Sequence, residues 1–154
     1  MKPISDFATQ FNVRATLDES LIAKKDNRLF LLNKNLEKLI QKEFYYAGAY
    51  LGKAKNGKFF PSFSLLTMIA NARNANKVTV DKKTAWLFIC GRDVFHRGIT
   101  ETKGSRKKGS YTLVLNERGE CLGFGKIVRD LAEETAGVAV KNISDIGDFL
   151  RRER

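Results

Sequence analysis

Residues 111–128 read YTLVLNERGECLGFGKIV, and the fold class expected for the second half of the chain rests on this stretch. Two runs rich in β-branched and aromatic residues, Tyr111–Leu115 and Cys121–Val128, flank the segment NERGE, which has the composition of a turn. Such a pattern predicts two strands joined by a short connection. Further strands are predicted at Val138–Ile143 and at Lys77–Val80, where apolar and polar residues alternate. The second half is therefore expected to be a small β-rich domain.

Between these strands lies a compact apolar segment, Lys82–Cys90. Its run Ala85–Cys90 fits either a buried helix or a buried strand, because short apolar runs do not distinguish the two. Large aromatic side chains in apolar runs usually build cores. Trp86, Phe88 and Phe63 are accordingly predicted to be core residues.

The first half of the chain begins with a helix pattern and a hairpin pattern. Ser5–Asn12 is expected to be a short amphipathic helix, with Ser5 as its N-cap and two phenylalanines at positions i and i+4. Apolar runs at 20–23 and 28–32 flank Asp-Asn, which tolerates the backbone of a tight turn, so a hairpin is predicted. From Asn33 onward, the leucine spacing predicts a second helix.

A second hairpin and a third helix are predicted next. Aromatic-rich runs, at Phe44–Leu51 and around Phe59, are joined by Asn-Gly at residues 56–57, which is the strongest two-residue hairpin signal. Pro61 and the serine after it end the strand and cap a helix that runs to about Ala72.

The stretch Asn71–Asn76 contains three asparagines and no large apolar residue, and it is the best candidate for a domain boundary. The predicted fold class is therefore α+β. Residues 1–75 form an N-terminal α/β domain with an antiparallel sheet, and residues 76–154 form the β-rich domain.

The composition is strongly basic. Lys and Arg total 28 and Asp and Glu total 17, which gives a formal charge of +11. Such an excess predicts a polyanionic partner, either nucleic acid or an acidic membrane face. The 43% hydrophobic content excludes a disordered basic tail. Two distant cysteines, no apolar leader and no membrane-length apolar run favour a soluble cytoplasmic protein without a membrane partner.

Few residues could carry catalysis. His96 is the only histidine, so a histidine metal cluster is excluded, and Cys90 lies six positions upstream without a nucleophile signature. A partly exposed or core-satisfied His96 fits better. The string Leu122–Lys126 (LGFGK) completes neither a Walker A nor a dinucleotide motif, so its glycines are interpreted as sites of strand bending or close packing. We expect no catalytic residue, no cofactor and no metal.

Basic residues gather near the middle of the second half. The string HRGITETKGSRKKGS ends at Ser110 and has five cations against Glu101, a local charge of +4. Glycine-rich backbone can approach a sugar-phosphate chain, and lysines and arginines neutralise phosphates, so a flexible loop that contacts nucleic acid is predicted. The alternative is a disordered loop that only aids solubility. The candidate cations are Arg97, Lys103, Arg106, Lys107 and Lys108, and Tyr111 beside them is the first candidate for stacking on bases.

A second basic cluster, with Arg151 and Arg152, ends the chain. Nucleic-acid binding and helix capping are equally consistent with it, because Ser144 and Asp145 could open a helix or helical turn whose negative C-terminal end would favour arginines. Weaker candidates are Lys126 and Arg129, which flank the LGFGK strand, and the turn lysines Lys53, Lys55 and Lys58.

The second half resembles a PUA domain, the pseudo-barrel named for pseudouridine synthases and archaeosine transglycosylases. The features that carry the resemblance are KVTV at 77–80, WLFICGRDVFHRGI at 86–99, LGFG at 122–125 and VAV at 138–140. LGFGK followed by SDIGDFLRRE is similar to the C-terminal signature of the Nip-seven family of large-ribosomal-subunit biogenesis factors. AGAYLGKAKNGKFFPSFSLLTMIA, at 47–70, resembles the segment that joins the two domains of that family.

The resemblance implies an archaeal-type, non-catalytic, monomeric protein that binds pre-rRNA during processing and large-subunit assembly. It implies an N-terminal α/β domain, with ribosome-assembly proteins as partners, packed against a C-terminal PUA-type β pseudo-barrel that binds single-stranded or irregular RNA. The residues placed on that RNA surface are Arg92, Arg97, Gly98, Ile99 and Thr100, with Lys126, Arg151 and Arg152 as basic neighbours. The alternatives are an RNA-targeting subunit of an RNA-modifying enzyme and a protein-interaction adaptor.

Overall fold

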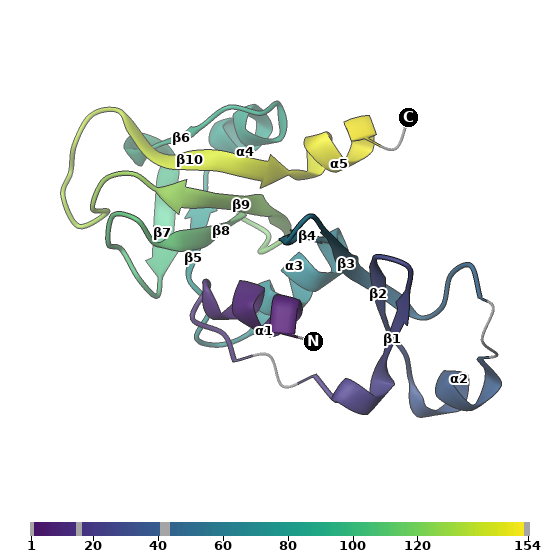
Figure 1. Cartoon of the computed structure of the whole chain (residues 1–154). Helices are drawn as coiled ribbons and strands as arrows, with labels where there is room; N and C mark the ends of the chain where they lie inside the picture. The colour runs from purple at the N-terminus through teal and green to yellow at the C-terminus, as the bar shows by residue number, and fades with distance from the viewer. Residues whose placement is uncertain (1, 15–16, 41–43, 153–154) are drawn as a thin grey trace.

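The computed structural model describes residues 2–14, 17–40 and 44–152. Figure 1 shows β5 to β10 and α4 on one side of the molecule, and β1, β2 and α2 on the other. The elements in chain order are α1 (Lys2–Thr9), η1 (Glu19–Leu21), β1 (Ile22–Lys25), β2 (Arg28–Leu31), α2 (Lys34–Leu39), β3 (Ala49–Lys55), β4 (Lys58–Pro61), α3 (Phe63–Asn71), β5 (Lys77–Val80), α4 (Lys82–Ile89), β6 (Val94–Phe95), η2 (His96–Gly98), β7 (Ile99–Lys103), β8 (Tyr111–Leu115), β9 (Cys121–Ile127), β10 (Val138–Asp145) and α5 (Ile146–Arg152).

The second half forms a curled six-stranded sheet in the order β6-β10-β9-β8-β5-β7. Its strand pairs are antiparallel except for β5 with β8, which run parallel. Alternate residues of the strands point to the interior, where they meet Phe88 of α4 in a buried cluster. The strands predicted in the second half are confirmed, and so is the α+β class.

Two strands in this sheet were not predicted. β6 is two residues long, and β7 occupies the first part of the segment predicted to be a basic loop. β7 pairs with β5, with Lys103 opposite Lys77, and it forms one edge of the sheet. Charged side chains are common on edge strands, because one side of the strand faces water. The charges that suggested a loop are therefore compatible with a strand.

The first half contains a four-stranded antiparallel sheet in the order β1-β2-β3-β4. Both predicted hairpins are confirmed, and Asp26 and Asn56 in their turns have positive φ values of 52°. The predicted helices α2 and α3 are also confirmed. Asn33 and Ser62 cap them by accepting hydrogen bonds from the backbone amides of the third helical residues, at 2.8 and 3.1 Å.

Three predictions in the first half need correction. α1 begins at Lys2, so Ser5 lies inside the helix, where its carbonyl accepts a hydrogen bond from Thr9 Oγ1, and is not the N-cap. The first hairpin strand begins at Ile22, after a short 3-10 turn. The strand predicted from Phe44 begins only at Ala49. In each case the residue composition located the element but not the residue at which it begins.

The apolar core is continuous across the predicted boundary. Phe7 and Phe11 of α1 pack against Phe124 of β9, with ring centroids 5.5 and 5.6 Å apart. Leu113 and Leu115 of β8 belong to the same buried cluster as the helices of the first half. α1 and α3 therefore cover part of the outer face of the curled sheet (Figure 1).

Candidate nucleic-acid interface

Helix α4 positions Trp86, the most exposed aromatic side chain among those that the structure describes in the second half. Its N-terminus is capped by Asp81, whose Oδ1 accepts a hydrogen bond of 2.7 Å from the amide of Thr84. The hydrogen bonds from Thr84 hold the pKa of the Asp81 carboxyl below its ordinary value, against a smaller opposing effect of burial. The cap fixes where the helix starts, and Phe88 anchors its inner face in the core.

Trp86 is not a core residue, in contrast to the prediction. Its side chain is 65% exposed, whereas Phe88 is fully buried. Helical residues that are two positions apart point about 200° away from each other, so burying Phe88 turns Trp86 to the solvent. The neighbouring Lys82 and Lys83 are exposed as well. An apolar run without clear periodicity did not reveal which residue would face outward.

A second exposed ring lies on β6, next to α4 (Figure 1). Val94 points into the core and Phe95, its neighbour on the strand, is 45% exposed. The guanidinium carbon of Arg97 lies 5.9 Å from the centroid of the Phe95 ring, a cation–π arrangement. Arg92, in the connection between α4 and β6, is exposed too. We call the exposed cations and rings of this region the α4 surface: Lys82, Lys83, Trp86, Arg92, Phe95 and Arg97.

Gly98, Ile99 and Thr100 connect the α4 surface to the sheet. Gly98 is buried, and a Cβ atom there would overlap Oγ1 of Thr84 on α4. Its carbonyl accepts a hydrogen bond of 2.9 Å from the Asp81 amide. Ile99 packs against the barrel core, and Thr100 Oγ1 donates to the carbonyl of Thr79 on β5 at 3.2 Å. These residues hold α4 and β7 together.

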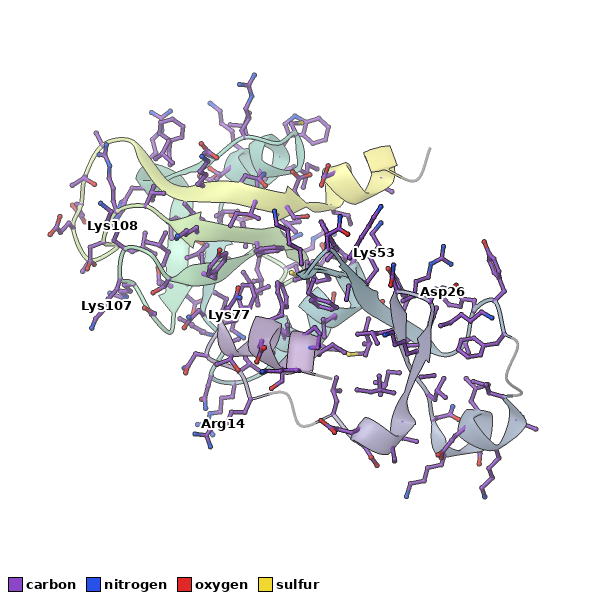
Figure 2. The ribbon with its side chains drawn as sticks, viewed as in Figure 1. Arg14, Asp26, Lys53, Lys77, Lys107 and Lys108 are labelled. Atoms are coloured by element: carbon purple, nitrogen blue, oxygen red, sulfur yellow. The ribbon has the colours of Figure 1, made fainter. Side chains whose placement is uncertain are left out.

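Residues 104–110 form the basic turn between β7 and β8. The turn was predicted to be a flexible loop, but hydrogen bonds fix it at three places. The Ser105 amide donates to Asn76 Oδ1 at 2.9 Å, the Gly109 amide to the Ile127 carbonyl at 2.7 Å, and the Leu131 amide to the Arg106 carbonyl at 2.9 Å. Arg106, Lys107 and Lys108 are exposed, and Figure 2 shows the two lysines at the end of the molecule away from the N-terminal sheet.

Tyr111, Lys126 and Lys141 form a row across β8, β9 and β10, because each is paired with the next in register. The Lys126 ammonium lies 5.8 Å from the centroid of the Tyr111 ring, and that ring contacts Phe11 at 6.2 Å. Tyr111 is thus half-buried between α1 and a lysine, which leaves it less surface for stacking than Trp86 has.

The remaining predicted cations have other surroundings. Lys103 forms an exposed ion pair of 3.3 Å with Glu101. Arg129 donates from Nη1 to the Ala136 carbonyl at 2.8 Å and so ties down the connection between β9 and β10. Arg151 and Arg152 lie in α5, which Asp145 caps through the Asp148 amide at 2.8 Å, and their side chains are outside the described part of the structure. A helix does follow Asp145, as one of the two alternatives expected, and it includes both arginines.

The predicted RNA-binding residues therefore do not share one surface. Arg92 and Arg97 belong to the α4 surface, while Arg106, Lys107 and Lys108 belong to the basic turn. Sequence reasoning missed Trp86 and Phe95 as exposed rings. No local signal in the sequence marked Trp86 as exposed, because the side of α4 that faces the core is set by tertiary packing.

His96 and Gly123, which the sequence offered as candidates for chemistry, make contacts that support the fold. Nε2 of the half-buried His96 lies 3.3 Å from the Leu131 carbonyl, so the interpretation of a satisfied histidine is confirmed. A Cβ atom at Gly123 would overlap the Ser144 carbonyl of β10, which confirms that the LGFGK strand needs glycine for close packing.

The described ranges 2–14, 17–40 and 44–152 contain no group of three or more histidine, cysteine or acidic side chains that could hold a metal ion. Within the same ranges, every helix falls short of the length and apolar character that a bilayer-spanning segment requires.

A family model described as "UPF0113 PUA domain" matches residues 76–154. A curated relative, a UPF0113 protein of Archaeoglobus fulgidus, is 29% identical over 115 residues, which cover 71% of this chain and 64% of the relative. The chain thus spans less than two thirds of that relative's length.

Solved structures with a similar fold cover nearly the whole chain. A conserved PUA domain protein from Thermoplasma acidophilum has a TM-score of 0.63 and 24% identity, and a hypothetical protein from Pyrococcus horikoshii OT3 has a TM-score of 0.62 and 17% identity. Each alignment covers 99% of this chain and 92% of the other. A PUA domain from Aeropyrum pernix K1 has a TM-score of 0.52 and 23% identity, over 62% of this chain and 56% of the other. At these identities the similarity concerns the fold alone.

Proposed function

The chain belongs to the UPF0113 PUA domain family, and from this premise we propose that it is a non-catalytic, cytoplasmic RNA-binding protein of ribosome assembly. Membership of a PUA family implies RNA binding. The finer proposal, that the RNA is pre-rRNA of the large subunit, is supported by the resemblance of LGFGK and SDIGDFLRRE to the Nip-seven signature.

The observation that carries the proposal is the exposed Trp86 amid cations. Single-stranded RNA is commonly bound by stacking of bases on aromatic side chains, while lysines and arginines neutralise the phosphates. The α4 surface supplies both, because Trp86 and Phe95 are exposed rings and Lys82, Lys83, Arg92 and Arg97 are exposed cations. We infer that single-stranded or irregular RNA binds at the α4 surface, with additional phosphate contacts at the basic turn.

The first half would contact assembly proteins. Near α2 it exposes Leu39, Tyr45 and Tyr46, with 75%, 84% and 60% of their side-chain surface open. Large apolar side chains that are exposed together mark interaction sites more often than chance. This part of the proposal is separate from RNA binding and could fail without affecting it.

The experiment that tests the proposal measures binding of a fluorescently labelled single-stranded RNA to the full chain. The variant Trp86→Ala combined with Arg97→Ala should bind at least about tenfold more weakly, because a stacked base contributes about 1–3 kcal/mol. The control Lys34→Ala with Lys38→Ala changes exposed cations on α2 and should bind like wild type. Equal binding by all three proteins would contradict the assignment of the α4 surface.

The role in ribosome assembly is tested by crosslinking the protein to RNA in cells and sequencing the RNA. Precursor segments of large-subunit rRNA should dominate the crosslinked RNA. Crosslinks spread over unrelated transcripts, in proportion to their abundance, would contradict it.

A further inference from the structure

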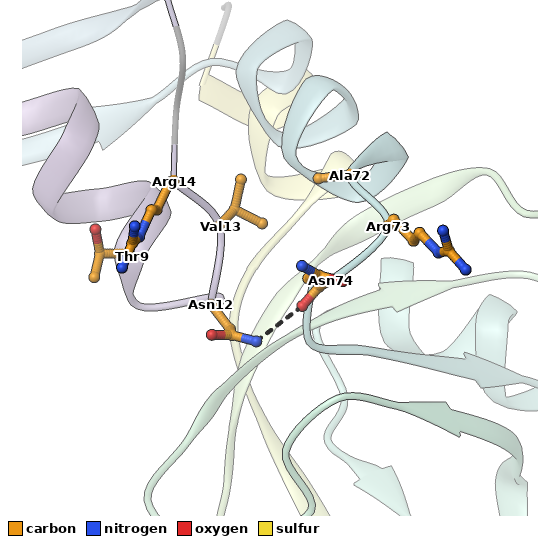
Figure 3. Close-up of a pocket in the computed structure, with 7 residues that line it drawn as sticks. All are labelled: Thr9, Asn12, Val13, Arg14, Ala72, Arg73 and Asn74. Atoms are coloured by element: carbon orange, nitrogen blue, oxygen red, sulfur yellow. Dashed lines mark hydrogen bonds between the residues drawn. The ribbon is translucent and has the colours of Figure 1, made fainter.

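The first half of the chain contains a basic cleft where α1 ends beside the segment that follows α3. The cleft has a volume of about 490 Å³ and is lined by Thr9, Asn12, Val13, Arg14, Ala72, Arg73 and Asn74. Figure 3 shows Arg14 on one side together with Thr9, Arg73 on the opposite side, and Val13 and Ala72 between them. The cleft thus offers two cations separated by a small apolar surface.

The two arginines are open to an incoming anion. Both are exposed, and none of the described residues that line the cleft carries a carboxylate. Among the described residues, neither Arg14 nor Arg73 forms an ion pair with an acidic side chain. A guanidinium without an acidic neighbour is suited to a phosphate, which it can bind through two parallel hydrogen bonds.

Lys77 offsets the negative partial charge at the end of helix α3, which lines the cleft. The C-terminal end of α3, at Ala72, lines the cleft, and the carbonyls at a helix C-terminus carry partial negative charge that would repel a phosphate. Lys77 offsets this charge, because its Nζ donates to the carbonyls of Ala70 at 2.8 Å and Ala72 at 3.4 Å. The cleft is therefore positive on both sides without a negative helix end between them.

Hydrogen bonds fix the two walls relative to each other. Asn12, which has a positive φ of 61°, donates from Nδ2 to the Asn74 carbonyl at 3.2 Å (Figure 3). The amide of the buried Asn76 donates to the Phe11 carbonyl at 2.9 Å. The positions of the two walls are thus fixed by hydrogen bonds that do not involve either arginine.

The same residues connect the cleft to the basic turn. Asn76 Oδ1 accepts the Ser105 amide at 2.9 Å, at the start of the turn. Arg73 lies three residues before Asn76, so their Cα atoms are at most about 11 Å apart. Lys77 is paired in register with Lys103. Asn76 and Lys77 therefore link the segment that lines the cleft to β7 and to the start of the basic turn.

We propose that the cleft is a second RNA contact, in which a single strand passes between Arg14 and Arg73. One backbone phosphate contacts Arg14 and another contacts Arg73, and the strand between them crosses the cleft over Ala72. The strand continues toward the basic turn. This inference rests on the proposed function, and it gives the first half of the chain a role in RNA binding.

The test compares binding of a labelled single-stranded RNA by the wild-type chain, by Arg14→Glu with Arg73→Glu, and by Lys34→Glu with Lys38→Glu. The last variant has the same change in net charge, on exposed residues of α2. Loss of two charge-assisted contacts should weaken binding about tenfold or more near 0.1 M salt. The slope of log affinity against log salt should fall in magnitude by about 1.4, which is roughly 0.7 for each phosphate. The α2 variant should keep the wild-type slope.

Three outcomes separate the possibilities. If the cleft variant has the affinity and slope of the α2 variant while the wild type binds RNA, the cleft inference is overturned and the proposed function stands. If the wild type binds no RNA, the proposed function itself fails. If inorganic phosphate stabilises the wild type but not the cleft variant, and RNA affinity is equal, the cleft is a site for free anions, which also overturns the inference.

A milder variant guards against misfolding. Arg14→Gln with Arg73→Gln removes the charges without adding carboxylates, and circular dichroism should show the wild-type fold, since both side chains are exposed. Its slope should fall by a similar amount. A folded Gln variant with the wild-type slope would overturn the inference even if the Glu variant did not fold.

Discussion

The α4 surface and the basic turn lie in the same half of the chain and carry similar charge, but only the α4 surface has exposed rings beside its cations. Arg97 stacks on Phe95 there, and Trp86 is open to solvent. The basic turn has Arg106, Lys107 and Lys108 on a backbone fixed by hydrogen bonds. Salt screens phosphate contacts strongly, whereas stacking on a ring depends little on salt. The two surfaces should therefore differ in how their loss changes the salt dependence of RNA binding.

The largest expected effect comes from filling the contact between Gly98 and Thr84, which supports the α4 surface. Gly98→Ala places a Cβ atom where Thr84 Oγ1 lies, so α4 must move away from η2. Overpacking of this kind lowers the free energy of unfolding by about 1–3 kcal/mol. RNA affinity should fall as well, because Trp86 and Arg97 are displaced relative to each other. Chemical denaturation and RNA titration measure the two effects.

The double variant Thr84→Ala with Gly98→Ala is the matched control, since it removes the atom that the new methyl group meets. It should recover part of the lost stability. A Gly98→Ala protein that is as stable as wild type would show that the contact is not needed.

The next effect is the loss of the exposed ring. Trp86→Ala should weaken RNA binding by about 1–3 kcal/mol, the value typical of one stacked base. The slope of log affinity against log salt should not change, because no phosphate contact is removed. Trp86→Phe keeps a ring and should retain most of the affinity. A Trp86→Ala variant with an altered salt slope and wild-type affinity at high salt would contradict the stacking of bases on the α4 surface.

A smaller effect concerns the cap of α4. Asp81→Ala should lower the free energy of unfolding by about 1 kcal/mol, as is typical for loss of an N-cap side chain. Because hydrogen bonds from Thr84 hold the pKa of Asp81 below 3.8, the contribution is fully present above pH 3.8 and is lost as the pH falls through the lower folded-state value. The difference between wild type and variant should therefore shrink in acid. Asp81→Asn can still cap the helix, so its stability difference from wild type should be smaller than that of the Ala variant.

The smallest effect at high salt is expected at the basic turn. Lys107→Glu with Lys108→Glu should reduce the magnitude of the salt slope by about 1.4 if each lysine neutralises one phosphate. Affinity should fall at low salt and approach wild type as salt rises. Titrations at four or more salt concentrations measure the slope. An unchanged slope would mean that the turn lies outside the RNA path.

Residue alternation and turn chemistry predicted most of the fold. β8 and β9 were visible as runs rich in β-branched and aromatic residues, and the hairpin at Asn56 followed from its Asn-Gly pair. β7 was missed because its charges, which are tolerated at a sheet edge, look like those of a loop. Trp86 was misplaced because its exposure depends on the phase of α4 relative to the core, which is a tertiary property.

The candidate site was less predictable than the fold. Charge clusters such as Lys107 and Lys108 are visible locally, whereas the cleft joins residues far apart in sequence. Asn12 and Asn74, which bond across it, are separated by 62 positions. Neither Arg14 nor Arg73 stands in a basic run, so only the folded chain brings them to one cleft.

Stacking of RNA bases on the α4 surface can be measured through the fluorescence of Trp86, because the chain contains one tryptophan and it lies on that surface. A single-stranded RNA is titrated into the full chain while tryptophan emission and the anisotropy of a label on the RNA are followed together. If bases stack on the α4 surface, RNA quenches the emission of Trp86 with the same midpoint as the anisotropy change. RNA that binds by anisotropy and leaves the emission of Trp86 unchanged would contradict the account.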